Sequence, residues 1–133
     1  MNAMHSLSSL EGMLAGDHHR LDSAFHTIVA RARSGDFDQL DAEWRAFLDA
    51  LLDHLNAEER NLIPALAEDR PVEAQILLDE HTGIRLKLLR LGFDLRVRCL
   101  GAERVDAFVG ALRAHAEREE RIFYPWVDSQ LVH

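Results

Sequence analysis

The stretch HLNAEERNLIP occupies residues 54–64, and a second version of it, HAEREERIFYP, occupies residues 115–125. Both fit the pattern His-x3-Glu-Glu-Arg-x3-Pro. Each places a histidine and a glutamate four residues apart, so the two side chains share one face of a helix and lie one turn from each other. Because apolar residues surround these pairs at helical spacing, we expect the pairs to point into the protein core.

The rest of the chain has the composition of a helical protein. Its 133 residues, with 7 Gly and 3 Pro, suit a single domain over residues 1–133, and the abundant alanine, leucine, glutamate and arginine favour helix. Three turn signals divide the chain, at Ser34-Gly35-Asp36, Asp69-Arg70-Pro71 and Cys99-Leu100-Gly101. We predict a first helix that ends near Arg33 and three more over residues 38–68, 72–98 and 102–124.

Glycine and proline mark weak points within these helices. Gly12 and Gly16 predict a break that leaves residues 1–12 as a short extra helix or arm. Pro64 and Pro125 close the two related stretches, and each is expected to kink or loosen its helix because proline lacks a backbone N–H group.

Each predicted helix carries an apolar stripe in steps of three and four residues, interrupted by polar side chains. The four stripes are Leu14, His18, Leu21, Phe25, Ile28 and Ala32; Phe47, Leu51, His54, Glu58, Leu62 and Ala65; Leu77, His81, Ile84, Leu88, Leu91 and Leu95; and Phe108, Leu112, His115, Glu119, Ile122 and Trp126. Every helix therefore has one histidine on its core line, and the second and fourth helices also have a glutamate.

Short connections make neighbouring helices antiparallel, which predicts an all-α, up-down-up-down antiparallel four-helix bundle. In such a pair, residues equidistant from the turn lie at the same height. The midpoint between His18 and the His54/Glu58 pair falls near residue 37, and the midpoint between that pair and His81 falls between 68 and 69. The midpoint between His81 and the His115/Glu119 pair falls at 99, so all three lie beside the predicted turns. We therefore expect six residues to share one layer: His18, His54, Glu58, His81, His115 and Glu119.

A buried layer of this kind predicts a metal site. A carboxylate in an apolar core is strongly disfavoured unless it is neutralised or paired, and these four histidines and two glutamates include no permanent cation. Imidazole and carboxylate together suit Fe, Zn, Mn or Co better than Mg or Ca. The six side chains can hold one ion, or two ions if the carboxylates bridge them.

Other polar residues near the stripes are expected to have ordinary roles. His5 and His133 lie near the chain ends, His19 lies off the stripe, and His26 is about 12 Å from His18 along the helix axis at ~1.5 Å per residue. Asp22, one turn after His18, could orient it, although exposure is the simpler expectation. Glu59 and Glu120 follow the glutamates of the layer and are expected to be solvated or to support the ligands. Aromatic packing rather than cofactor stacking is expected for Trp44, Phe93 and Trp126.

Several classes of function are disfavoured. The net charge of −8 and the lack of a basic patch argue against nucleic-acid binding. No apolar run is long enough for a membrane span and no signal peptide is recognisable, so a cytoplasmic location is expected, which the single cysteine, Cys99, also fits. The sequence has neither an HExxH motif nor a glycine-rich phosphate loop, and one cysteine cannot form a cysteine zinc site. Enzymatic turnover is not predicted.

The chain resembles the hemerythrin-like family, also called the HHE cation-binding domain. The residues that carry the resemblance are Asp-His-His-Arg-Leu-Asp at 17–22, HLNAEERNLIP at 54–64, Glu-His at 80–81 and HAEREERIFYP at 115–125. The resemblance extends from about Met13 to Trp126. It implies a four-helix bundle around a non-haem di-iron centre that is bridged by an oxo or hydroxo oxygen derived from solvent.

Carried onto this chain, the resemblance implies that His18 and His54 bind one iron and that His81 and His115 bind the other, with Glu58 and Glu119 as bridges. It also implies a role in binding or sensing O2, NO or reactive oxygen species, or in handling iron.

One position departs from the oxygen-carrying members of that family. They have a further histidine one turn after the position of His81, and this chain has Arg85 there. Arg85 can turn inward to pair with a glutamate, which leaves one iron with fewer ligands, or extend along the surface. A mononuclear or zinc-filled site with a structural or regulatory role is therefore an alternative, with another divalent transition metal in place of zinc if that metal is available. A third alternative is an interaction module. The chain is expected to be a monomer or a homodimer.

Overall fold

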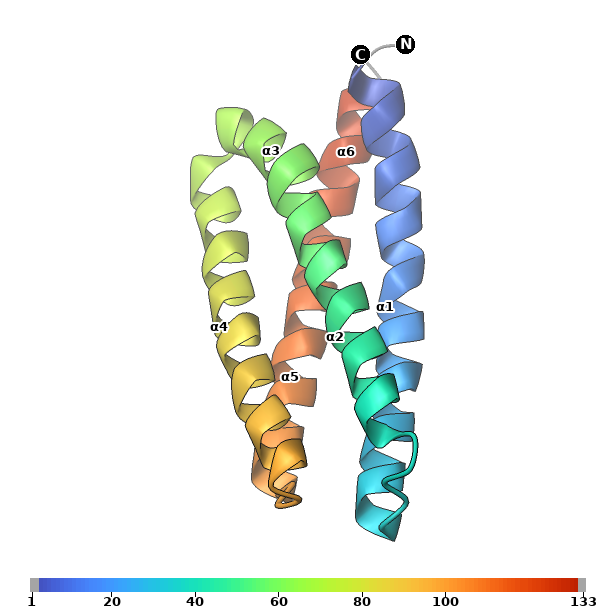
Figure 1. Cartoon of the computed structure of the whole chain (residues 1–133). Helices are drawn as coiled ribbons and strands as arrows, with labels where there is room; N and C mark the ends of the chain where they lie inside the picture. Colours follow the sequence, from blue (N-terminus) through green and yellow to red (C-terminus); the bar gives the residue numbers. More distant parts are fainter. Residues whose placement is uncertain (1–2, 132–133) are drawn as a thin grey trace.

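Four long helical arms run up and down in a computed structural model, which describes the backbone of residues 3–131 and the side chains of residues 16–130 (Figure 1). The predicted all-α four-helix architecture is confirmed, and residues 3–131 contain no strand. The arms are formed by α1 (Ala3–Ser34); by α2 (Leu40–Ala57), η1 (Glu58–Leu62) and α3 (Ile63–Asp69); by α4 (Pro71–Arg96); and by α5 (Ala102–Arg118), η2 (Glu119–Phe123) and α6 (Tyr124–Leu131).

The ends of the arms follow from glycine and proline. Gly35, with φ of +79°, adopts the left-handed conformation that commonly follows a helix C-terminus, and it terminates α1. Pro71 stands at the start of α4, where the missing N–H group leaves no hydrogen bond unmade. The break predicted at Gly12 and Gly16 does not occur, because α1 continues through both positions from Ala3.

The arms bury the predicted stripes against one another in two apolar clusters. The larger cluster is centred on Phe25, Phe47 and Phe108, whose ring centroids lie 4.8–6.1 Å apart. The smaller cluster includes Leu62 and Phe123, and it lies nearer the end of the bundle where α1 begins and α6 ends (Figure 1). Along each of the last three arms the predicted polar residues lie at or next to the boundary between these clusters.

The packing of individual stripe residues largely follows the prediction. Most are buried, and the side chain of Leu14 lies outside the described residues. The half-buried ones are His18, Ala32, Ala65, Leu112 and Ile122. Packing was also predicted for Phe93, and this is wrong because its side chain is 62% exposed on the outer face of α4. Within residues 3–131, no helix combines the length and the apolar character that crossing a bilayer requires.

Candidate metal centre

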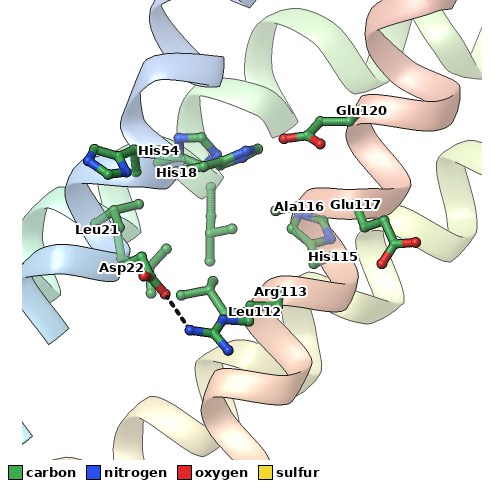
Figure 2. Close-up of a pocket in the computed structure, with 13 residues that line it drawn as sticks. His18, Leu21, Asp22, His54, Leu112, Arg113, His115, Ala116, Glu117 and Glu120 are labelled. Atoms are coloured by element: carbon green, nitrogen blue, oxygen red, sulfur yellow. Dashed lines mark hydrogen bonds and ion pairs between the residues drawn. The ribbon is translucent and has the colours of Figure 1, made fainter. Parts of the chain in front are cut away.

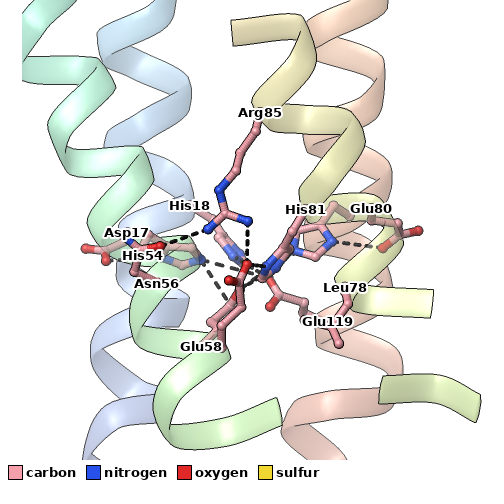
Figure 3. A network of polar contacts seen from close by, with 12 residues as sticks. Asp17, His18, His54, Asn56, Glu58, Leu78, Glu80, His81, Arg85 and Glu119 are labelled. Carbon is pink, nitrogen blue, oxygen red and sulfur yellow. Dashed lines mark hydrogen bonds and ion pairs between the residues drawn. The ribbon is translucent and has the colours of Figure 1, made fainter. Parts of the chain in front are cut away.

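Six polar side chains from all four arms converge in one layer (Figure 3). The two glutamates are fully buried, and His18 is the most exposed of the four histidines, with 15% of its side chain exposed. The layer brings together every residue predicted from the sequence: His18, His54, Glu58, His81, His115 and Glu119.

The donor atoms form two groups that share one glutamate. Glu58, His81, His115 and Glu119 offer ligand atoms within 4.8 Å of one another, and so do His18, His54 and Glu119. Oε1 of Glu119 lies 3.0 Å from Nε2 of His18 and 3.5 Å from Nε2 of His115. A single carboxylate therefore connects a histidine of each group.

Glu58 also reaches both groups. Its Oε1 lies 3.0 Å from Nε2 of His81, and its Oε2 lies 3.5 Å from Nε2 of His54. The two glutamates therefore lie between the two histidine pairs, which is the position that a bridging ligand would need.

A π-helical turn presents each of these glutamates. The N–H group of Ile63 donates to the carbonyl of Glu58, five residues back, and the N–H group of Tyr124 donates to that of Glu119. Each π turn is followed by proline, so the loosening predicted at Pro64 takes this form. The wider turn allows Glu58 and the apolar residues after it, Leu62 and Ile63, to be buried together.

A carboxylate binds the outer nitrogen of three of the histidines. Nδ1 of His54 lies 3.2 Å from Asp17, Nδ1 of His81 lies 2.6 Å from Glu59, and Nδ1 of His115 lies 2.8 Å from Glu80. A carboxylate accepts hydrogen bonds, so each Nδ1 carries a proton, and in the neutral ring Nε2 is left as an acceptor toward the centre. This arrangement commonly orients the histidine ligands of metal ions.

The supporting carboxylates are themselves held by arginine. Arg118 donates from Nε to Glu80 at 2.8 Å, and Arg20 contacts Asp17 from the next turn of α1. Asp17 and Glu80 were not predicted as supporting residues. Each directly precedes a histidine of the layer, His18 or His81, and contacts a different histidine across the bundle, so this repeated acid-histidine pair is the signal that could have identified them.

The family model of the hemerythrin HHE cation binding domain matches residues 10–127. The chain belongs to this family. Comparisons with curated proteins and with solved structures gave no match.

The donor set of this hemerythrin-type chain fits a bound cation. Nε2 of His81 and Nε2 of His115 face each other at 3.0 Å. If each neutral ring carries its proton on Nδ1, the two Nε2 lone pairs point at each other, which is unfavourable. Within the described part of the chain, several inward atoms have no hydrogen-bond partner: Nε2 of His54, both oxygens of Glu58 and Oε2 of Glu119. Unsatisfied acceptors in a buried layer are costly, and a metal ion would satisfy them together.

In the metal-free protein, protons supply part of the missing positive charge. Burial lowers the pKa of His54, but its contacts with Glu119 and Glu58 outweigh burial and raise that pKa to about 10. Burial acts on His115 in the same way, and contacts with Glu58 and Glu119 raise its pKa to about 9. Burial acts to raise the pKa of Glu58, yet its contacts with Glu119 and with the histidines of the cluster hold that pKa well below its usual range. The layer therefore stores positive charge as protons when no metal is bound.

Arg85 turns toward the site, although it does not join the ligand groups. It donates to Glu59 at 2.6 Å and to Asn56 at 2.8 Å (Figure 3). Glu59 in turn accepts from Nδ1 of His81, and the pair of contacts lowers the pKa of the Glu59 carboxyl although burial opposes this. Arg85 is thus connected to a candidate ligand through one carboxylate.

The remaining candidate residues lie away from the ligand groups. His26 is exposed and contacts Asp22, which also faces Arg113 across the α1–α5 boundary. Asp22 therefore does not orient His18. His19 and Glu120 are exposed. His18 instead has the Tyr124 hydroxyl 3.5 Å from its Nε2, a neighbour that was not predicted.

A cavity of about 380 Å³ reaches the layer between α1 and α5 (Figure 2). Its inner wall includes His18, His54 and His115, and its apolar wall includes Leu21 and Leu112. The Asp22–Arg113 contact, at 3.5 Å, lies beside it (Figure 2). The centre is therefore accessible to small molecules on one side, mainly at the histidine pair His18 and His54.

Proposed function

We propose that the chain holds two iron ions in a carboxylate-bridged centre. His18 and His54 would hold one ion, His81 and His115 the other, and Glu58 and Glu119 would bridge them. The observation that carries this proposal is the membership of Glu119 in both ligand groups, because one buried carboxylate between two histidine pairs suits two cations. Bound metal also supplies the positive charge that a layer with two buried carboxylates and no permanent cation needs.

We further propose that the centre binds or senses a small ligand, namely O2, NO or a reactive oxygen species. Iron, when bound, supplies redox chemistry and a coordination position for such a ligand. The cavity is lined by both histidines of one proposed ion, His18 and His54, but by one histidine of the other pair, His115, so the first ion is the one that a ligand would reach. The cavity volume of about 380 Å³ is ample for a diatomic molecule.

The protein residues around the centre have two tasks in this proposal. Asp17, Glu59 and Glu80 fix the orientation of three histidines and keep each Nε2 directed inward. The apolar wall formed by Leu21 and Leu112 limits water near the ions, which slows metal loss and strengthens electrostatic contacts inside.

Metal analysis combined with visible spectroscopy tests the proposal. Protein purified without chelator is analysed for bound metals, and spectra are recorded under argon, air and nitric oxide. We expect iron as the principal metal and spectra that change with the gas. A protein that binds one zinc ion and shows no gas-dependent spectrum would instead support the structural or regulatory zinc alternative.

Alanine variants of two histidines separate metal binding from a purely structural bundle. His54→Ala and His115→Ala remove one candidate ligand from each pair. We expect each variant to lose bound iron and the thermal stabilisation that bound metal provides. If the bundle used these residues only for packing, the metal content of the purified protein would not respond to either change.

A further inference from the structure

The outer face of α4 carries a second apolar stripe that the bundle does not cover. Leu89 is 73% exposed and Phe93 is 62% exposed, and the two are flanked at helical spacing by Leu86 and Val97. This stripe lies opposite the buried line of α4, which passes through Ile84, Leu88, Leu91 and Leu95. A contiguous exposed apolar surface on a folded protein commonly marks an interaction site.

The stripe borders a groove between α2 and α4, two helices that lie side by side (Figure 1). The groove has a volume of about 760 Å³, and Trp44, Leu48 and Leu52 line it on the α2 side. Gly92 lies close to Trp44, because a Cβ atom at that position would be 3.4 Å from Nε1 of Trp44, an ordinary van der Waals contact. The combination is a concave, largely apolar surface between two helices.

Positive charge surrounds this groove although the chain as a whole carries −8. The charged residues that line it are Asp41 and four arginines, Arg45, Arg85, Arg96 and Arg98. Arg85 is paired with Glu59, and Arg98 stacks over the Phe37 ring with 3.8 Å to its centroid. Among side chains 16–130, Arg45, Arg96 and Arg98 have no carboxylate within ion-pair distance. Unpaired guanidinium groups beside an apolar groove are available to an acidic partner.

We propose that the α2–α4 groove docks an amphipathic helix of another protein, with apolar residues on one face and acidic residues on its flanks. An apolar helix face in a groove between helices is a common mode of peptide recognition. A second copy of this chain fits less well, because face-to-face pairing would place arginine-rich rims against each other. An anionic membrane fits less well too, because the net charge of −8 opposes approach to it.

Two designed helical peptides test the proposal without knowledge of the natural partner. Both have the same leucine face; one has glutamate flanks and the other has lysine flanks. Their binding to the full chain is measured by fluorescence anisotropy at several salt concentrations. We expect the glutamate peptide to bind more tightly than the lysine peptide and to weaken as salt rises.

Variants of exposed residues locate the binding surface without endangering the fold. Leu89→Glu and Arg96→Glu are each expected to reduce the binding affinity for the glutamate peptide by about tenfold or more, as substitutions at the centre of an interface commonly do. Val72→Glu is the matched control, because Val72 is an apolar α4 residue, 69% exposed, that does not line the groove. It is expected to leave binding unchanged.

Four outcomes would overturn the proposal. The first is equal binding of the two peptides, and the second is an equal effect of Leu89→Glu and Val72→Glu. The third is a dimer in sedimentation analysis that Leu89→Glu dissociates, because a second copy would then occupy the groove. The fourth is binding to phosphatidylserine vesicles, lost in Leu89→Glu, in place of peptide binding. None of these outcomes depends on the metal content of the protein, so the proposed iron centre is tested independently by metal analysis.

Discussion

Glu119 Oε1 lies 3.0 Å from Nε2 of His18, so the last arm of the bundle contacts the first, α1, within the candidate metal centre. The same oxygen lies 3.5 Å from Nε2 of His115. This carboxylate therefore joins two ligand groups that the sequence places on four separate helices.

Removing the charge of Glu119 is expected to affect both proposed ions. In Glu119→Gln the neutral amide neither balances the ions nor bridges them well, so bound iron should fall from two ions per chain to at most one. Metal analysis of the folded variant checks this. Glu120→Gln is the matched control, because Glu120 is the next residue and is exposed. Retention of two ions by Glu119→Gln would exclude a bridging role for this residue.

Loss of the carboxylate behind His54 is expected to weaken metal binding without removing a ligand. Asp17→Asn replaces the acceptor that holds Nδ1 of His54 at 3.2 Å, and changes of this kind typically cost about 10–100-fold in metal affinity. Competition with a chelator measures the change. Asp22→Asn lies on the same helix, where Asp22 contacts His26 and Arg113 instead. Equal metal affinities for the two variants would count against the proposed support by Asp17.

The stability of the metal-free protein is expected to fall as the pH rises above neutrality. The folded-state pKa values of His54 and His115 are raised to about 10 and about 9, above the value of about 6.5 expected in the unfolded chain. The folded protein then binds more protons than the unfolded chain between these values, so this stabilisation is complete below about pH 6.5 and is lost as the pH rises through about 9 to 10.

Thermal unfolding of chelator-treated protein across this pH range measures the effect. The iron-loaded protein should vary less over the same range, because metal replaces the protons on the imidazoles. A metal-free protein whose melting temperature is constant between pH 6.5 and 10 would contradict the assignment of raised pKa values to the two histidines.

Arg85 is expected to tune metal retention at acidic pH through Glu59. Arg85→Gln removes the contact that helps to lower the pKa of Glu59, so protonation of Glu59 and release of iron should occur at higher pH than in the unchanged protein. Arg85→Lys keeps the charge and should restore most of the difference. An identical release profile for all three proteins would mean that Arg85 serves only as a surface contact.

The sequence predicted the arms and the layer well, because both depend on periodic spacing. Turn residues divided the chain close to the observed helix ends. The His54/Glu58 pair and His81 have their midpoint between residues 68 and 69, beside the second turn, and this placed them at one height. The prediction of a helix break at Gly12 and Gly16 was wrong, because α1 is continuous through both positions. A single glycine destabilises a helix by only about 1 kcal/mol, which tertiary packing can outweigh.

Other features depend on contacts between distant parts of the chain and were not predictable from spacing. The π turns at Glu58 and Glu119 follow from how the arms pack, and only the prolines after them gave a signal. Asp17 contacts His54 across the bundle, whereas local spacing pointed to Asp22 and His18. The exposed position of Phe93 also required the structure, because an aromatic residue at helical spacing usually packs inside.

An anaerobic titration of metal-free protein with ferrous iron tests the central claim most directly. The claim is that the buried layer of imidazoles and carboxylates exists to enclose two cations. We predict tight uptake that ends at two iron ions per chain, and loss of this end point in His54→Ala and His115→Ala. Uptake that ends at one ion per chain or fewer, or a normal end point in both variants, would contradict it.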